Sequence, residues 1–241
     1  MNASISSSQL CHELVIGGIT PFTTIDFPGR LAAVLYTQGC TWNCRYCHNT
    51  HLQPFQSPHP IPFRKVLDFL ENRLGLLDGV VFCGGEPTAQ AGLGEAMRAV
   101  KALGFQVALH TAGIYPDPFR EVLPLCDWVG MDIKAPFDCY EKITQTKNSG
   151  ASIRQSLKAL LESGVDHEIR TTWHPALLSE AEILEMAKEL SGMGVERYVI
   201  QGFQPKGCGD SGLKGVGAGR EIMSAELRST LSSLFNSFMV R

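Results

Sequence analysis

Short apolar segments alternate along this chain with longer segments in which apolar residues recur every three or four positions. The first pattern is typical of buried strands and the second of amphipathic helices. Such an alternation predicts parallel strands joined by crossover helices. The six predicted strands cover residues 31–36, 79–82, 106–109, 128–133, 168–172 and 198–201.

Capping residues and breakers predict where the helices between these strands begin and end. Ser179 is followed three positions later by Glu182, the spacing of a capping box, and Ser152 is followed in the same way by Gln155. Gly164 is expected to end the helix that Ser152 begins. Further helices are expected from Pro62, from about Gln90 to Leu103, and from Ser224 through Phe238.

Six strand–helix units are two fewer than a closed eight-stranded barrel requires. We therefore expect an α/β fold, a partial and open (β/α)6 TIM-type barrel, in which functional residues gather at the carboxyl ends of the strands. Residues 1–14 include a serine-rich stretch and are expected to form a short flexible extension. Residues 15–241 are expected to form a single domain.

Composition and charge narrow the classes of partner and compartment. Hydrophobic residues make up 44% and charged residues 19% of the chain, a balance typical of an ordinary globular protein. The net charge of −3, without long runs of one sign, favours neither nucleic acid nor a membrane surface as a partner. Residues 1–10 lack the features of a signal peptide, and no apolar stretch reaches membrane-spanning length, so we expect a cytoplasmic, soluble protein.

Three of the eight cysteines fall within eight positions, at Cys40, Cys44 and Cys47. This segment is called the cysteine loop below. Its spacing, C-x3-C-x2-C, provides three thiolates, whereas an electron-transfer cubane cluster normally takes four. The spacing therefore predicts a [4Fe-4S] cluster with one iron left open for a substrate to coordinate.

Three other interpretations of the cysteine loop fit its residues less well. A structural zinc held with His48 is awkward, because Cys47 and His48 are adjacent in the sequence. The string from Cys44 to His48 also matches c-type haem attachment, but that reaction occurs outside the cytoplasm. A disulfide is disfavoured by the same argument from compartment.

Two further groups of residues lie at predicted strand ends. The turn Gly84-Gly85-Glu86-Pro87 follows the second strand, and its glycines let main-chain groups approach a ligand closely. Asp132 and Lys134 end the fourth strand, and strand alternation places their side chains on the same side.

Together, the cysteine loop, this turn and Asp132-Ile133-Lys134 resemble the radical S-adenosylmethionine superfamily. More narrowly, they resemble the activating proteins of anaerobic ribonucleoside-triphosphate reductase. The resemblance is closest over residues 17–49 and continues thinly to about Gln204. Where many relatives carry Asp-Thr-Asn-Gly, this chain has His110-Thr111-Ala112-Gly113, which puts any cation or ribose contact at that place in doubt.

The resemblance implies two cofactors, a [4Fe-4S] cluster and S-adenosyl-L-methionine, whose amino and carboxylate groups chelate the open iron. No side chain is implied as a catalytic acid or base, since the cofactors carry the chemistry. The cluster ligands would be Cys40, Cys44 and Cys47. The residues implied in binding S-adenosylmethionine are Tyr46, Gly84, Gly85, Glu86, Asp132, Lys134 and Arg170.

The implied activity is reductive cleavage of S-adenosylmethionine to produce a glycyl radical on anaerobic ribonucleoside-triphosphate reductase. The expected electron donor is a flavodoxin or a ferredoxin. Three alternatives stay open: an activase of another glycyl-radical enzyme of the pyruvate formate-lyase type, a radical enzyme acting on a small molecule such as a deazaguanine synthase, and a non-catalytic zinc or electron-transfer protein.

Overall fold

The computed structural model describes residues 14–213 and 223–241. The extension expected over residues 1–14 lies outside the described residues, except for Leu14. That residue is buried, with 3% of its surface exposed.

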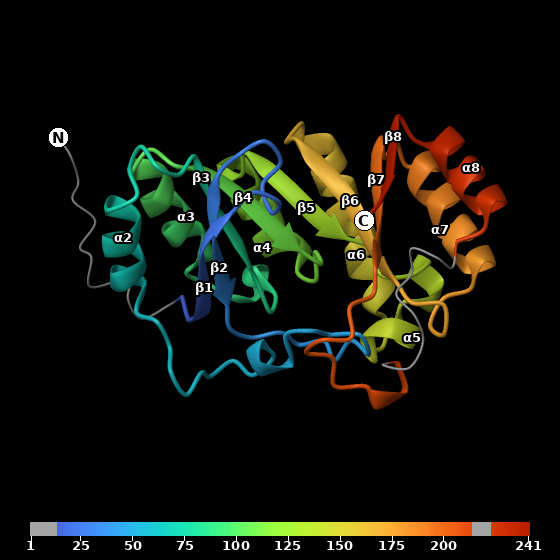
Figure 1. Ribbon diagram of the computed structural model, residues 1–241, viewed down its shortest axis with the longest axis horizontal. Helices are drawn as coiled ribbons and strands as arrows, with labels where there is room; N and C mark the ends of the chain where they lie inside the picture. Colours follow the sequence, from blue (N-terminus) through green and yellow to red (C-terminus); the bar gives the residue numbers. More distant parts are fainter. Residues whose placement is uncertain (1–13, 214–222) are drawn as a thin grey trace. The chain divides into compact units, whose positions relative to one another are not determined.

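The strands follow one another through the sheet in the order of the sequence, from β1 to β8 (Figure 1). β1 pairs antiparallel with β2, whereas the β2–β3, β3–β4, β6–β7 and β7–β8 pairs are parallel. In the described residues the sheet is open, with β1 and β8 at its edges. The strands are β1 (Ile16–Thr23), β2 (Ala32–Thr37), β3 (Gly79–Gly84), β4 (Gln106–Thr111), β5 (Trp128–Asp132), β6 (His167–Trp173), β7 (Arg197–Gly202) and β8 (Ser237–Val240).

The expectation of an α/β fold with an open, mostly parallel sheet is confirmed. The six predicted strands correspond to β2 through β7, but the count of six is too low. β1 was not predicted, because Gly17, Gly18 and Pro21 interrupt its apolar pattern and an edge strand needs only one buried side.

The last helix is shorter than predicted. α8 (Ala225–Leu234) ends where Phe235 takes an extended conformation, and Phe238 lies in β8. Both phenylalanines contact the ring of Tyr198 in β7, at centroid distances of 4.9 and 6.1 Å. Their three-residue spacing fits a helix, but contact with Tyr198 is achieved from extended backbone.

Four of the other helices lie close to predicted segments: α2 (Phe63–Glu71), α3 (Leu93–Ala102), α6 (Ser149–Ser163) and α7 (Glu180–Gly192). Two short helices, α4 (Pro116–Val122) and α5 (Glu141–Thr144), were not predicted; they have only seven and four residues. Short 3-10 turns complete the secondary structure: η1 (Thr50–Leu52), η2 (Pro87–Ala89), η3 (Leu123–Leu125), η4 (Phe137–Cys139) and η5 (Ser211–Leu213).

One of the two predicted capping boxes is present. Ser179 and Glu182 cap α7 reciprocally, and Gly164 ends α6 in the left-handed conformation, both as predicted. Ser152, in contrast, lies inside α6, which begins at Ser149. The first turn of α6 packs so closely on the carbonyl of Phe137 that a Cβ at Gly150 would overlap it, and this close approach fixes the earlier start.

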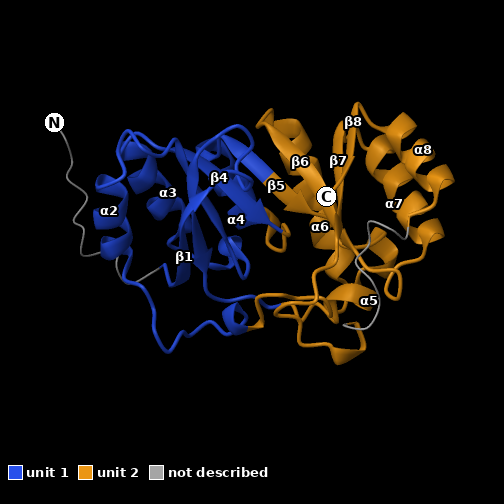
Figure 2. Cartoon of the chain, in the orientation of Figure 1, with its two compact units in different colours: residues 1–41, 51–111, 117–129 blue, residues 42–50, 112–116, 130–241 orange. Residues whose placement is uncertain are grey.

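The chain divides into two compact units (Figure 2). The first comprises residues 1–41, 51–111 and 117–129, and the second comprises residues 42–50, 112–116 and 130–241. The first has an apolar cluster that includes Phe27, Val81 and Trp128. In the second, strands β6 and β7 bury Ile169 and Tyr198 completely.

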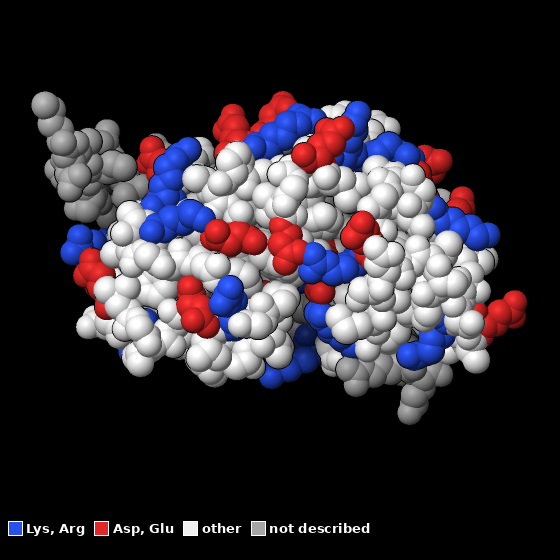
Figure 3. Space-filling view, turned by 90° about the horizontal axis from the view of Figure 1, so that it is seen from above, with Lys and Arg blue, Asp and Glu red and all other residues white. Residues whose placement is uncertain are grey.

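The described residues include no helix that is both long enough and apolar enough to span a membrane. On the face shown in Figure 3, lysine and arginine are interspersed with aspartate and glutamate, and neither sign forms an extended patch there.

Candidate functional site

The chain segments that lead into and out of the cysteine loop are hydrogen-bonded to each other in the first unit. The Gly39 amide donates to the Leu52 carbonyl at 2.7 Å, and the Cys40 amide donates to the Gln53 carbonyl at 2.9 Å. We call residues 38–40 together with 51–53 the neck of the loop. The neck fixes the main chain of Cys40, whose thiol is half-buried.

The turn that follows β3 packs directly on the neck. Gly84 has a φ of +121°, and a Cβ there would overlap the main chain of Thr37. A Cβ at Gly85 would overlap the Gly39 carbonyl, which also accepts a hydrogen bond from the Glu86 amide at 2.8 Å. Both positions therefore require glycine for packing inside the protein, whatever else they bind.

Glu86 is buried, with 1% of its surface exposed, and its carboxylate is held by two threonines. Oε1 accepts from the amide and hydroxyl of Thr88 at 3.1 and 2.6 Å, and from the hydroxyl of Thr111 at 2.6 Å. Glu86 thus ties the turn after β3 to the end of β4. In the described structure this oxygen shapes the turn.

In the second unit, the cysteine loop continues as a turn against α5. The Cys47 amide donates to the Cys44 carbonyl at 3.0 Å, and the Arg45 amide donates to the Ile143 carbonyl at 3.1 Å. Burial raises the pKa of both thiols, and the nearby Lys134 ammonium opposes this effect.

Asp132, Lys134 and Arg170 form one cluster in the second unit. The Arg170 Nε donates to Asp132 Oδ1 at 3.0 Å, and the Lys134 Nζ lies 3.6 Å from Oδ2. Arg170 also donates to the Gly130 carbonyl at 3.2 Å. The side chains of Arg170 and Lys134 are only 9% and 12% exposed, so one carboxylate balances two cations that are largely removed from water.

Tyr46 joins this cluster through its ring, since the Lys134 Nζ lies 5.5 Å from the ring centroid. Tyr46 is 5% exposed, and its hydroxyl makes no well-formed hydrogen bond among the residues that the structure describes, although the Lys134 ammonium lies close enough to interact with it. Burial raises the pKa of this hydroxyl, so it is neutral at physiological pH. An orphaned buried hydroxyl is costly, and a ligand that bonds to it would recover that cost.

A later segment, residues 207–210, packs against the same turn. Asp210 forms an ion pair with Arg45 at 2.9 Å, and the Cys208 thiol donates to the Arg45 carbonyl at 3.4 Å. A Cβ at Gly207 would overlap the His48 carbonyl. These residues lie some 160 positions from their partners, and no local sequence pattern signals such a contact.

His110 is a packing residue in the described structure of the first unit. Its Nε2 lies 2.7 Å from the Asp26 carbonyl oxygen, and its ring lies 5.5 Å from that of Trp128.

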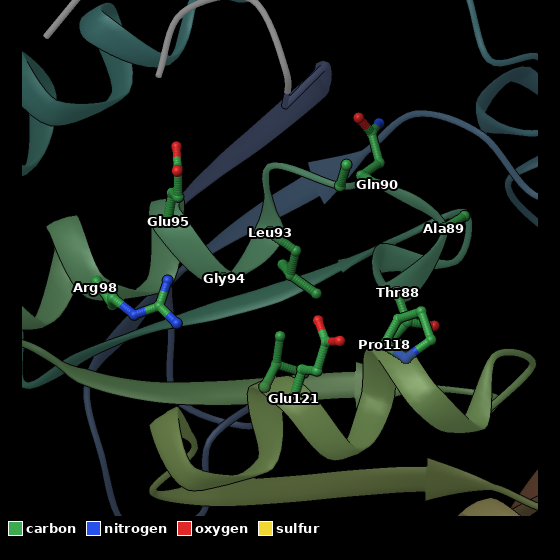
Figure 4. Close-up of a pocket in the computed structure, with 11 residues that line it drawn as sticks. Thr88, Ala89, Gln90, Leu93, Gly94, Glu95, Arg98, Pro118 and Glu121 are labelled. Carbon is green, nitrogen blue, oxygen red and sulfur yellow. The ribbon is translucent and has the colours of Figure 1, made fainter. Parts of the chain in front are cut away.

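A cleft of about 500 Å³ in the first unit lies beside η2, between α3 and α4 (Figure 4). Its lining includes Leu93, Arg98, Pro118 and Glu121, and none of the site residues implied by the sequence. Thr88 and Gln90 of the turn after β3 form one wall, so the cleft lies against the outer side of that turn.

The residues present fit a [4Fe-4S] cluster and S-adenosylmethionine. Thiols are the ligands that iron–sulfur clusters take, and the cysteine loop provides three. Lys134 and Arg170 supply buried positive charge suited to a carboxylate, and the Tyr46 hydroxyl is a buried group in need of a partner. No group of three or more His, Cys, Asp or Glu side chains in the described ranges is arranged to hold a single metal ion.

Comparisons with known proteins agree with this chemistry. The family model of the radical SAM superfamily matches residues 34–177. The chain is 29% identical over 239 residues to a candidate glycyl-radical enzyme activating enzyme of Methanocaldococcus jannaschii, covering 95% of this chain and 96% of that protein. It is 31% identical over 173 residues to the pyruvate formate-lyase-activating enzyme of Clostridium pasteurianum, covering 69% and 71%.

Among solved structures, SuiB of Streptococcus suis bound to S-adenosylmethionine aligns with a TM-score of 0.64 at 14% identity. The alignment covers 86% of this chain and 49% of SuiB, so the chain spans about half the length of that protein. This likeness supports the fold, and the family match covers more than half of the chain. The protein therefore belongs to the radical S-adenosylmethionine superfamily, whose cofactors are a [4Fe-4S] cluster and S-adenosylmethionine.

Proposed function

We propose that this protein uses a cluster bound by Cys40, Cys44 and Cys47 to cleave S-adenosylmethionine and to produce a glycyl radical on anaerobic ribonucleoside-triphosphate reductase. The observation that carries the activase assignment is the similarity, along 95% of the chain, to a protein named for activating a glycyl-radical enzyme. The choice of reductase rests on the resemblance over residues 17–49.

Each site residue has a role in this proposal. Cys40, Cys44 and Cys47 would hold the cluster through their thiolates, and a cluster held by three thiolates would leave S-adenosylmethionine a place to bind. Arg170 and Lys134 offer positive charge to the cofactor, and Asp132 fixes the orientation of both cations. Gly84 and Gly85 keep the turn in register with the neck.

When bound, the two cofactors together supply an electron and a carbon-centred radical that removes a hydrogen atom from a glycine. The protein binds, orients and shields them, and none of its acids or bases needs to transfer a proton. Trp42 and Tyr46, 4% and 5% exposed, keep water from the cysteine loop.

The ligand assignment is tested by anaerobic reconstitution followed by reduction with S-adenosylmethionine present, with 5'-deoxyadenosine as the measured product. Cys44→Ala should abolish the product. The matched control is Cys126→Ala, since Cys126 is also a free cysteine but lies in the first unit, is buried, and donates a hydrogen bond to the Val122 carbonyl. A Cys44→Ala variant that formed product at the rate of the control would refute the assignment.

The partner is tested separately by electron spin resonance. The reduced protein is mixed with anaerobic ribonucleotide reductase or with pyruvate formate-lyase, and a glycyl-radical doublet is sought on each. The second enzyme is the alternative partner, favoured by the 31% identity to a pyruvate formate-lyase-activating enzyme. A doublet on pyruvate formate-lyase alone would move the assignment there. Product formed without a doublet on either would favour a small-molecule substrate.

The electron donor is proposed to be a flavodoxin or a ferredoxin. Replacing the chemical reductant with each reduced carrier in turn, and measuring 5'-deoxyadenosine, distinguishes them. Metal analysis of anaerobically prepared protein tests the zinc alternative, which predicts zinc without acid-labile sulfide.

A further inference from the structure

We propose that Gln38 and Gln90 are positioning residues that hold the neck of the cysteine loop, and with it the Cys40 ligand, in the geometry that the cluster requires. This inference rests on the proposed function, because it takes Cys40 to be a cluster ligand. Gln90 lies outside the motifs that carry the family resemblance, and Gln38 lies within the stretch of closest resemblance, which assigns it no role.

Gln90 connects the turn after β3 to the chain that leads into the cysteine loop. Its side-chain Oε1 accepts from the Val15 amide at 3.1 Å, and its Nε2 donates to the carbonyls of Val15 and Gln38 at 3.2 and 2.5 Å. Figure 4 shows its side chain pointing away from the cleft between α3 and α4. One side-chain amide thereby bonds both main-chain groups of Val15, as a neighbouring strand would.

Gln38 connects the two halves of the neck. Its amide donates to the Val15 carbonyl at 2.8 Å, and its side-chain Nε2 donates to the His51 carbonyl at 2.9 Å. The side chain lies over Gly17, where a Cβ would overlap its Oε1. Gln38 therefore fixes the chain two residues before Cys40 relative to the chain that leaves the loop.

Both glutamines are buried, with 2% and 9% of their surface exposed. Burying an amide is unfavourable unless it is hydrogen-bonded, and an apolar side chain of similar length could fill the same space. The partners named here are all main-chain groups of the neck or of Val15 beside it. Unlike an apolar side chain, each of these amides forms directional hydrogen bonds. Those bonds specify where the neck carbonyls lie.

The test compares Gln38→Met and Gln90→Met with Tyr198→Phe. The control removes a buried hydrogen bond of 2.9 Å between Tyr198 and Thr171, which belong to the second unit, whereas the neck belongs to the first. After anaerobic reconstitution, the measurement is the first-order rate at which iron is released to a chelator. Spin resonance of the reduced cluster is recorded in parallel.

Residues that support metal ligands typically change metal affinity by tenfold or more when they are removed. Both glutamine variants should therefore release iron about tenfold faster than the wild type, with altered cluster spectra. Tyr198→Phe should release iron at the wild-type rate. If Gln90→Met does not fold, as judged by circular dichroism, Gln90→Asn replaces it, because the shorter amide cannot reach both Val15 and Gln38.

Two results would overturn the inference, and they are separable. Folded glutamine variants that released iron no faster than Tyr198→Phe would refute the positioning role and leave the proposed function intact. A wild-type protein that assembled no cubane cluster, or a Cys44→Ala variant that retained a normal one, would refute the proposed function itself.

Discussion

Asp132 is the residue on which the charge balance of the site depends. Its two oxygens face Arg170 and Lys134, whose side chains are 9% and 12% exposed. Lys134 also approaches the ring of Tyr46, while its main-chain amide donates to the Tyr140 hydroxyl at 2.9 Å. Removing the carboxylate would take away the counter-charge that it supplies to two nearly buried cations.

Asp132→Asn should lower the free energy of unfolding of the cofactor-free protein by about 1–3 kcal/mol, because its two cations are nearly buried while the Asp132 carboxylate is 33% exposed and partly screened by water. Urea denaturation measures it. Asp117→Asn is the matched control, because Asp117 pairs with Arg120 but is 88% exposed, and its loss should stay under about 1 kcal/mol. Equal losses of unfolding free energy in the two variants would show that burial of the Asp132 cluster does not contribute to stability.

Tyr46→Phe should have opposite effects on stability and on binding. Removing a buried hydroxyl that makes no well-formed hydrogen bond, and only interacts with the Lys134 ammonium, should stabilise the cofactor-free protein by up to about 1 kcal/mol. If the cofactor supplies the missing partner, the same variant should bind S-adenosylmethionine more weakly in equilibrium dialysis of reconstituted protein. Tyr140→Phe, whose hydroxyl is already bonded, should instead be destabilised.

At the scale of elements, the turn between β3 and η2 shows how closely the site is built. Its two glycines bring main chain against main chain, at Thr37 and at Gly39, with no room for a methyl group. The carboxyl end of β3 and the segment before Cys40 therefore cannot move independently.

Gly85→Ala should destabilise the protein by about 1–3 kcal/mol through overpacking, and should reduce the iron bound per chain after reconstitution. Gly192→Ala is the control, since a Cβ at that helical position meets nothing within 4 Å. It should be neutral or slightly stabilising, by up to about 1 kcal/mol. A Gly85→Ala variant with normal iron content and stability would contradict the packing described here.

Element prediction succeeded where a local signal is strong. The six strands found from apolar runs all exist, and the reciprocal cap at Ser179 is present. It failed where long-range packing decides: β1 is an interrupted edge strand, and Phe235 and Phe238 pack on Tyr198 from extended backbone. Ser152 carried a capping signal, but the close approach of Gly150 to Phe137 begins the helix three residues earlier.

At the scale of the whole molecule, the sequence predicted the chemistry of the site better than it predicted the long-range contacts that hold the site residues in place. Asp132 and Lys134 were predicted to lie on the same side by strand alternation, and their oxygen and nitrogen lie 3.6 Å apart, although β5 ends at Asp132 and Lys134 lies beyond it. The link to Arg170 depends on strand pairing, 38 positions away. The bonds of Gln90 to Gln38 and of Arg45 to Asp210 span 52 and 165 positions, and no periodicity or motif encodes them.

Removing iron should lower the melting temperature of the whole protein. A ligand that binds only the folded chain stabilises it by about 2.7 kcal/mol when present at 100 times its dissociation constant, which corresponds to roughly 5–10 °C for a chain of this size. Calorimetry before and after anaerobic chelation measures the shift. The melting temperature of Cys44→Ala should not change on chelation. If the melting temperature of the wild-type protein did not change either, that would argue against a cluster coupled to folding.

The ion pair between Arg45 and Asp210 bears on how the protein matures in the cell. The ribosome makes Arg45 165 residues before Asp210, an interval of roughly 10–30 s at ordinary rates of synthesis. The thiols of the cysteine loop therefore emerge long before the residues that support the outer side of the same turn. Iron is therefore best delivered after translation ends. A nascent chain stalled before Asp210 should acquire iron poorly, even though all three thiols are exposed to the iron carrier.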